Sequence, residues 1–404
     1  MPTTQTEEFI QVKVSVVALR SLETPDMDPR IVMMSTFPPT QCGIATFAQS
    51  LSGAMTSAGS AVDVVQLAQS PTFMRPDAVV HQHRSSADIS RTSQVLNSYD
   101  VIVLQHEFGI YGGDDGIELL DMLSLVRVPV ITVIHTVLKT PTLRQRFIIQ
   151  GLIAASTVLV TMTNIARKNL IAHYEVAPEM VQVIPHGSPD LRRNDEAVSF
   201  TSGPRLLTWG LISRGKGIEW GIQALAKLSD IDPKVQYVVA GRTHPNVVAL
   251  EGERYRESLM QLASDLGVSD QLHLVNEYLD DSALAQLIAS ASIFLLPYDS
   301  RDQVTSGVLV EAMVAGGPVI ATRFPHAIEV LGRGAGVLVS HQSADEIAEA
   351  VRHIHHNPVQ AEHMRTLTCE LSVDYLWPAV GQSYLELAGS ISDKQSSPPA
   401  LAIA

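Results

Sequence analysis

The stretch LPYDSRDQVTSGVLVEAMVAGGPVIAT, residues 295–322, decides the fold. An apolar run ends at Leu296, a polar loop follows, and an apolar helix is expected from about Gly307. Gly316-Gly317-Pro318 then leads into a second apolar run. Short apolar runs that alternate with helices are typical of parallel strands buried on both faces of a sheet. The stretch therefore predicts one β-α-β unit of an α/β protein.

The same alternation extends through the rest of the chain in two series. In the first series, strands are expected at Arg30–Met34, Ala61–Leu67, Val101–Leu104, Val128–Ile134, Thr157–Thr161 and Val181–Pro185. In the second series, strands are expected at Arg205–Trp209, Gln236–Val239, Leu272–Val275, Ile293–Leu296, Pro318–Ala321 and Gly336–Val339, with helices at Ile218–Leu228, Arg254–Leu266, Ser282–Ser290 and Val308–Ala315. Two consecutive β-α-β series predict two doubly wound domains, which bind ligands beyond the carboxyl ends of their strands.

A segment rich in turn formers and charge, PHGSPDLRRNDEAVSFTSGP at 185–204, separates the two series. Such a composition is typical of a link between domains. We predict an N-terminal Rossmann-like domain at 1–188, a linker at 189–203 and a C-terminal Rossmann-like domain at 204–375. A helical pattern with Trp377 and Tyr384 follows at 376–392, and residues 393–404 are expected to form a flexible tail.

The overall composition excludes several classes of protein. The 404 residues include 28 Lys and Arg against 42 Asp and Glu, which gives a formal net charge of -14 and disfavours nucleic acid as a partner. Two cysteines, Cys42 and Cys369, are too few for a disulfide framework, and neither stands in a metal-ligand spacing. The amino terminus lacks the basic and apolar pattern of a secretory signal. These features favour a cytoplasmic setting.

The helix expected from Gly307 has the most specific site signal. The N–H groups of Gly307 and Val308, after Ser306, are placed to receive phosphate oxygens. Glu311, inside the apolar stretch VLVEAMVA, is placed to accept hydrogen bonds from the two hydroxyls of a ribose. An unpaired carboxylate in an apolar helix is costly, so Glu311 is expected to have a partner. The structural alternative is an internal ion pair.

A glycine-rich turn with two cations follows the strand that ends at Trp209. The turn, in WGLISRGKGIEWG, begins at Gly210 and includes Arg214 and Lys216 just before a predicted helix. Lysine acts as a point charge and arginine binds bidentately, so the pair would suit a diphosphate. The alternative is two solvated loop cations.

Two segments of the first series end in polar turns. Gly43, in STFPPTQCGIATF, precedes a predicted helix and would let backbone N–H groups approach an anion. His106, in QHEFGIYGG, lies at a strand end where a histidine can bond a sugar hydroxyl. His135 closes the run VITVIH and has the same interpretation. The alternatives are a plain strand-to-helix turn for Gly43 and a bond to a backbone carbonyl for each histidine, and for His135 this alternative is favoured.

The order of these pieces resembles family 4 of the retaining glycosyltransferases, which have the GT-B fold of two facing Rossmann-like domains. The resemblance extends from Ser35 to the tail helix around Tyr384, and it includes VIPHG before the linker and AGGPV after the acidic helix. Two further segments match, VVAGRTH at 238–244 and EYL at 277–279, near which such enzymes hold the base. Gly241 and Tyr278 are therefore expected beside the donor, and the C-terminal helix is expected to cross back to the N-terminal domain.

The resemblance implies transfer of a sugar from a nucleotide-diphosphate donor to a hydroxyl of a carbohydrate or lipid-linked acceptor, with retention at the anomeric carbon and without a metal or other cofactor. It implies that Arg214 and Lys216 bind the diphosphate, with Gly43 and Gly210 in the loops beside it. It further implies that His106 bonds the donor sugar and that Glu311 holds the ribose.

Two positions depart from the family pattern. The family has a Glu eight positions before the second Glu, and this chain has Gln303 there, which can bond a sugar hydroxyl in the catalytic site but brings no charge. The family often has Arg directly after the glycine of the cationic turn, where this chain has Leu211. These changes leave open a catalytically silent relative that binds nucleotide or sugar as a partner subunit. A third hypothesis is a sugar-nucleotide epimerase or a phosphorylase on the same two-domain plan.

One window of the acidic chain is basic. From Val126 to Arg193 there are eight cations (Arg127, Lys139, Arg144, Arg146, Arg167, Lys168, Arg192 and Arg193) and three acids (Glu175, Glu179 and Asp190), so 8 − 3 = +5. Such a window would let the N-terminal domain make weak peripheral contact with the inner face of an anionic membrane. The alternative, an ordinary solvated face or a lining of the cleft between domains, is the favoured interpretation.

Overall fold

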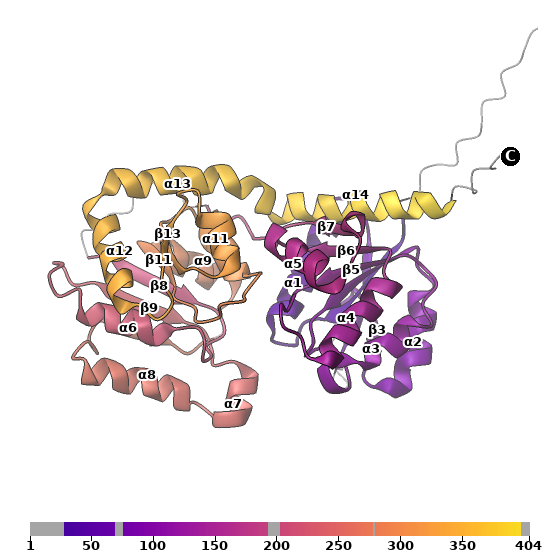
Figure 1. The fold of residues 1–404 in the computed structure, drawn as a ribbon, viewed down its shortest axis with the longest axis horizontal. Helices are drawn as coiled ribbons and strands as arrows, with labels where there is room; N and C mark the ends of the chain where they lie inside the picture. The colour runs from indigo at the N-terminus through magenta and orange to yellow at the C-terminus, as the bar shows by residue number, and fades with distance from the viewer. Residues whose placement is uncertain (1–27, 69–75, 193–202, 278, 397–404) are drawn as a thin grey trace, which may run out of the picture.

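A computed structural model describes residues 28–68, 76–192, 203–277 and 279–396, and these residues form two α/β domains (Figure 1). The N-terminal sheet has the order β3-β2-β1-β4-β5-β6-β7 and every pairing is parallel. Its strands are β1 (Ile31–Thr36), β2 (Val62–Leu67), β3 (Val79–His83), β4 (Val101–His106), β5 (Val130–Ile134), β6 (Val158–Thr161) and β7 (Val181–Val183). Its α-helices are α1 (Gly43–Ser57), α2 (Ile89–Leu96), α3 (Glu118–Leu123), α4 (Leu143–Ala155) and α5 (Asn164–Tyr174).

The C-terminal sheet has the order β10-β9-β8-β11-β12-β13 and is also parallel throughout. Its strands are β8 (Arg205–Trp209), β9 (Gln236–Ala240), β10 (Leu272–Val275), β11 (Ile293–Leu296), β12 (Val319–Thr322) and β13 (Val337–Val339). The helices that follow them are α6 (Ile218–Ala226), α7 (Pro245–Glu251), α8 (Arg254–Asp265), α9 (Asp281–Ser290), α10 (Gly307–Val314), α11 (Pro325–Leu331), α12 (Ala344–His356), α13 (Pro358–Ser372) and α14 (Trp377–Ser396). Two sheets of this kind confirm the predicted fold class.

The central strands are apolar on both faces because helices cover both faces. In β1, Val32 and Met34 join one buried cluster while Ile31 and Met33 join the cluster on the opposite face. Successive strand side chains point to opposite faces, so a strand with two covered faces has no polar alternation. This is why the short apolar runs in the sequence identify the strands.

One strand was missed by the sequence prediction. β3, VVHQH, is at the edge of the N-terminal sheet, and only Val79 is fully buried, whereas the four following residues are partly or fully exposed. An edge strand needs little apolar surface, so it lacks the continuous run that marks the central strands. The predicted linker falls mainly on residues 193–202, which lie outside the described residues.

Helix α14 runs from the C-terminal domain across the N-terminal domain, as Figure 1 shows. Val380 and Tyr384 are buried in the same apolar cluster as Phe47 of α1. Gly381 allows the close approach, since a Cβ there would lie 2.8 Å from the Cβ of Ala54. The expected return of the C-terminal helix is therefore confirmed.

A loop of the C-terminal domain is packed into the N-terminal domain. Val304, which precedes α10, is buried within the apolar cluster that includes Phe108 and Val137 of the N-terminal domain. Its carbonyl accepts a hydrogen bond from Thr163 Oγ1 at 2.9 Å. The loop that contains Gln303 is thus held at the cleft by both domains.

A second contact between the domains links α11 to α5. Glu329 Oε1 accepts a hydrogen bond from the backbone N–H of Asn164, and Oε2 accepts one from that of Ile165, each at 2.8 Å. Carboxylates are favoured at a helix N-terminus, where N–H groups lack intrahelical partners.

We expect Glu329→Ala to lower the free energy of unfolding by about 1–2 kcal/mol, measured in urea. Glu362→Ala, which removes an exposed ion pair with Arg365, is the control and should change it by less than about 1 kcal/mol. Equal losses in both variants would contradict a special role for Glu329.

Candidate active site

The carboxyl edge of the C-terminal sheet places Glu311 beside Trp209. Trp209 ends β8, and its Nε1 donates a hydrogen bond to Glu311 Oε2 of α10 at 2.7 Å. Burial raises the pKa of Glu311 to about 7. The partner that the sequence required is thus a neutral indole rather than a cation, and a carboxylate with one bound oxygen can accept further hydrogen bonds.

The start of α10 is fixed by hydrogen bonds on both sides. Ser306 Oγ accepts a hydrogen bond from Leu309 N at 3.2 Å and caps the helix. The Ser306 N–H donates to Nδ1 of the buried His326 at 2.9 Å. Gly307 follows against the ring of His186 of the N-terminal domain, where a Cβ would lie 2.8 Å from the imidazole. Helix α10 therefore begins in contact with a side chain of the N-terminal domain.

Histidine 326 was not identified from the sequence. It lies in α11, directly after the strand β12, and burial beside His186 lowers its pKa to about 3. A neutral imidazole can accept from the Ser306 N–H, which an imidazolium could not do. The only sequence signal was its place, five residues beyond the end of the strand predicted at Pro318–Ala321.

Lysine 216 is packed against the end of β11. Its Nζ lies 4.3 Å from the centroid of the Tyr298 ring, and burial lowers its pKa to about 8. The turn around it is tight, because a Cβ on Gly217 would lie 1.8 Å from the carbonyl oxygen of Pro297. Lys216 is therefore a partly buried, positioned cation and not a solvated one.

Arginine 214 is held away from Lys216. Its Nε and Nη2 donate to the two carboxylate oxygens of Glu251, each at 2.9 Å, and its guanidinium lies 5.1 Å from the centroid of the Tyr255 ring. The side chain remains 61% exposed. The structure thus brings Arg214 to α7 and α8 rather than to the start of α10.

Two glycines of the candidate site allow close backbone approach. Gly241 has φ +143°, and a Cβ there would lie 2.0 Å from the carbonyl oxygen of Gly210. Gly210 itself has φ +101°, a conformation that side chains rarely adopt. The turns after β8 and β9 are therefore in contact. Tyr278 lies outside the described residues.

On the N-terminal side, His106 lies below the surface. Its ring is 1% exposed, packs against Phe108 and Tyr111, and has no hydrogen-bond partner among the described residues for either nitrogen. Burial lowers its pKa to about 3. The contact of His106 with the donor sugar stays a prediction, and in this conformation the ring is buried.

His135 is more accessible than His106. It is partly exposed, and its Nε2 lies 2.8 Å from Oε1 of Gln105. An amide oxygen only accepts, so Nε2 holds the proton and Nδ1 is left as an acceptor. Burial, together with His186 and His106, lowers the pKa of His135 to about 3 and keeps the ring neutral. The bond of Nε2 is to a side-chain amide and not to the backbone carbonyl that was favoured from the sequence, and a role of His135 in sugar binding stays a prediction.

The N-terminal glycine loop and Gln303 complete the cleft. Gly43 starts α1 after the N-cap Cys42, and a Cβ on it would meet nothing within 4 Å. Gln303 is partly exposed, and its Nε2 donates to the carbonyl of Thr305 at 3.1 Å. The neighbouring Asp302 lies 3.8 Å from Lys139 Nζ of the opposite domain. Both elements are thus open to the space between the domains.

Ion pairs reduce the charge of the basic window. Arg144 pairs with Asp114 at 2.8 Å, and Lys139 pairs with Asp302, so carboxylates from outside the window balance two of its cations. Arg192 pairs with Asp190 inside it. No helix in the described part of the chain is both long and apolar enough to cross a membrane.

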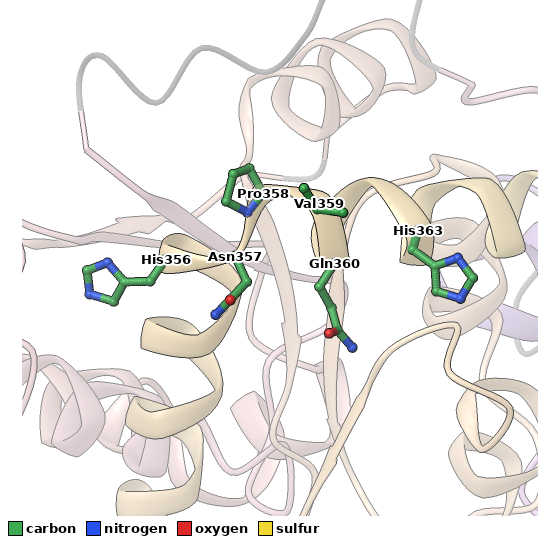
Figure 2. Close-up of a pocket in the computed structure, with 6 residues that line it drawn as sticks. All are labelled: His356, Asn357, Pro358, Val359, Gln360 and His363. Atoms are coloured by element: carbon green, nitrogen blue, oxygen red, sulfur yellow. The ribbon is translucent and has the colours of Figure 1, made fainter.

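A surface pocket lies elsewhere, at the corner between α12 and α13 (Figure 2). It has a volume of about 450 Å³ and is lined by His356, Asn357, Pro358, Val359, Gln360 and His363. Figure 2 shows the two imidazoles at opposite ends of the pocket. Within the described ranges, no group of three or more His, Cys, Asp or Glu side chains could hold a metal ion.

Comparison with known proteins shows a family similarity in the second half of the chain. Residues 193–368, less than half of the chain, match the family model of glycosyl transferases group 1. The matched region contains Lys216, Gln303 and Glu311, and it begins at the predicted linker.

Curated relatives are similar over part of their length. A D-inositol 3-phosphate glycosyltransferase of Catenulispora acidiphila is 29% identical over 239 residues, which are 56% of this chain and 56% of that protein. The lipopolysaccharide glucosyltransferase WaaG of Escherichia coli is 26% identical over 212 residues, 49% of this chain and 52% of WaaG. The chain thus spans about half the length of these curated relatives.

Solved structures share the fold over nearly the whole chain. Anabaena HepE in complex with UDP has a TM-score of 0.71 at 15% identity, covering 89% of this chain and 100% of that one. Sucrose-phosphate synthase of Thermosynechococcus elongatus has a TM-score of 0.71 at 16% identity, covering 91% of this chain and 100% of that one. At these identities the similarity shows the two-domain fold alone.

Proposed function

We propose that this protein transfers a sugar from a nucleotide-diphosphate donor to an acceptor hydroxyl, with retention at the anomeric carbon. The observation that carries the proposal is the placement of Lys216 and Glu311 at the carboxyl edge of one sheet. Lys216 lies against Tyr298, the second residue after β11, and Glu311 is bound to the last residue of β8. Ligands of open α/β sheets bind at this edge, and β8 and β11 are neighbours in the sheet.

Different residues would bind the ribose, the diphosphate and the sugar of the donor. Glu311 would accept from the ribose hydroxyls, while Lys216 and the N–H groups of Gly307 and Val308 would bind the diphosphate. These groups are preformed, so they stabilise the negative charge that develops as the bond from the anomeric carbon to the phosphate oxygen breaks. His135 Nδ1 would accept from a hydroxyl of the donor sugar, and Gln303 would bond another.

The acceptor would approach from the N-terminal domain. Its hydroxyl oxygen forms the new bond to the anomeric carbon on the face that the diphosphate leaves, and its proton passes to the leaving phosphate oxygen. No protein base is needed for this transfer, and the configuration is retained. Catalysis then rests on positioning and on electrostatic stabilisation by the C-terminal domain.

The named relatives suggest substrate classes. HepE has been solved with UDP and with UDP-glucose, and the curated relatives are named for inositol phosphate and lipopolysaccharide acceptors. We infer a nucleoside-diphosphate sugar as the donor and a glycan, a small glycoside or a lipid-linked sugar as the acceptor. Peripheral contact with an anionic membrane would follow only for the lipid-linked case.

The deciding experiment is a donor screen. Hydrolysis and transfer would be followed for UDP-, GDP- and ADP-sugars with an acceptor panel, and the anomeric configuration of the product would be read by NMR. Turnover with an inverted product would contradict retention. Absence of turnover with every donor, together with donor binding in calorimetry, would instead support the catalytically silent relative.

Gln303→Glu distinguishes the silent relative from a protein that has lost its site. If the unsubstituted protein binds donor without turnover, gain of activity in Gln303→Glu would show that the remaining site is intact. The substitution also removes the hydrogen bond from Gln303 Nε2 to the Thr305 carbonyl, because a carboxylate cannot donate. Thermal melting of the variant would report that loss separately from activity.

A further inference from the structure

The cationic turn needs a second positive charge that Leu211 does not supply. The leaving nucleoside diphosphate has more than one negative charge, whereas Lys216 has one positive charge. Lys216 alone therefore does not balance the charge of the diphosphate. Arg214 is bound on both carboxylate oxygens of Glu251. For Arg214 to bind a diphosphate, its bidentate pair with Glu251 would have to break.

Another arginine emerges next to Leu211 from the adjacent strand. Arg242 follows β9, and its backbone carbonyl accepts a hydrogen bond from Ile212 N at 2.8 Å. The preceding Gly241 is in contact with the carbonyl of Gly210. Arg242 therefore leaves the backbone beside the position at which the family pattern has its arginine.

The side chain of Arg242 reaches toward the N-terminal domain. Its Nη1 donates to Oε1 of Gln41 at 3.4 Å, and Gln41 directly precedes the N-cap of α1. The partner is a neutral amide, and no carboxylate among the described residues lies within ion-pair distance of this guanidinium. Both arginines are exposed, but Arg214 is paired with the Glu251 carboxylate, whereas Arg242 donates to the neutral Gln41 amide.

We propose that Arg242 is the second cation of the diphosphate site and binds the terminal phosphate, the one that carries the sugar. This assignment rests on the proposed function. The terminal phosphate must face the N-terminal domain, because the acceptor approaches from there, and Arg242 points to Gln41 of that domain. A guanidinium at this place would form a bidentate pair with two phosphate oxygens.

The assignment predicts a selective loss of diphosphate binding. Arg242→Gln should weaken UDP, GDP or ADP, whichever the unsubstituted protein binds, by on the order of 10-fold in calorimetry, as expected for a charge-assisted hydrogen bond. The corresponding monophosphate, which lacks the terminal phosphate, should lose much less. Arg242→Lys should retain part of the diphosphate affinity, because it keeps the charge.

Two further variants complete the comparison. Arg333→Gln is the matched control, since Arg333 is exposed and precedes β13 at the opposite edge of the sheet, and it should leave nucleotide binding unchanged. Arg214→Gln tests the competing assignment. A selective diphosphate loss in Arg214→Gln and none in Arg242→Gln would overturn the proposal, as would equal affinity in all variants. If no diphosphate binds the unsubstituted protein, the proposed function itself fails, and this assignment fails with it.

Discussion

Lys216→Ala should lower kcat/KM for the donor by about 10²-fold or more, the usual effect of removing a positioned group that stabilises charge in the transition state. Lys216 is partly buried and lies 4.3 Å from the centroid of the Tyr298 ring, so water cannot easily replace its ammonium group. The effect should appear in kcat as well as in KM, because charge on the diphosphate increases as the glycosidic bond breaks. Steady-state kinetics with the donor found in the screen is the measurement.

The pH profile adds a second test of Lys216. Its pKa of about 8 without ligand means that the lysine loses its charge as the pH rises through that value. Donor affinity should therefore fall above about pH 8 in the unsubstituted protein. Lys216→Arg, which stays charged, should bind donor with a flat profile in this range. If kcat/KM is unchanged in Lys216→Ala, this residue does not stabilise the diphosphate. If donor affinity is independent of pH in both the unsubstituted protein and Lys216→Arg, Lys216 does not titrate in this range.

The fold was predictable because its main elements are local in sequence. Each central strand is an apolar run, so the order of the central strands could be predicted up to small shifts of their ends. The edge strand β3 lacked that signal. Lys216, Ser306, Gly307 and Glu311 became candidate site residues because glycine turns and helix starts next to strand ends have recognisable residue types.

The partners of the site residues could not be predicted in the same way. Trp209 and Glu311 are separated by 102 positions, and Arg214 and Glu251 by 37. Sequence spacing gives the direction of a side chain on its own helix or strand, but contacts between elements depend on how sheets twist and helices pack. The contacts of Arg214 with Glu251 and Tyr255 depend on such packing, as does the position of Arg242 beside Ile212.

Glu311→Gln should also lower kcat/KM by on the order of 10²-fold, because a ribose with two hydroxyl donors would lose charge-assisted hydrogen bonds. The amide oxygen can still accept from Trp209 Nε1, so the fold around it should persist. Thermal melting at one pH checks this point before kinetics are compared. If Glu311→Gln is as active as the unsubstituted protein, Glu311 does not hold the ribose.

The pH dependence of Glu311 separates binding from stability with opposite signs. Burial raises its pKa in the fold to about 7, well above the value of about 4.3 for an exposed glutamate, so the fold favours the protonated form. The protonated carboxyl stabilises the fold fully below the pKa that Glu311 has in the unfolded chain, and this stabilisation is lost as the pH rises through about 7. Glu311→Gln should therefore be more stable than the unsubstituted protein at pH 8 but not at pH 4.

Donor binding has the opposite pH dependence, because the ribose hydroxyls donate to the ionised carboxylate. Donor affinity should therefore fall as the pH drops below 7. Urea unfolding at pH 4 and pH 8, with calorimetry of donor binding at pH 6 and pH 8, would show both slopes. Their loss together in Glu311→Gln would assign them to this one carboxylate.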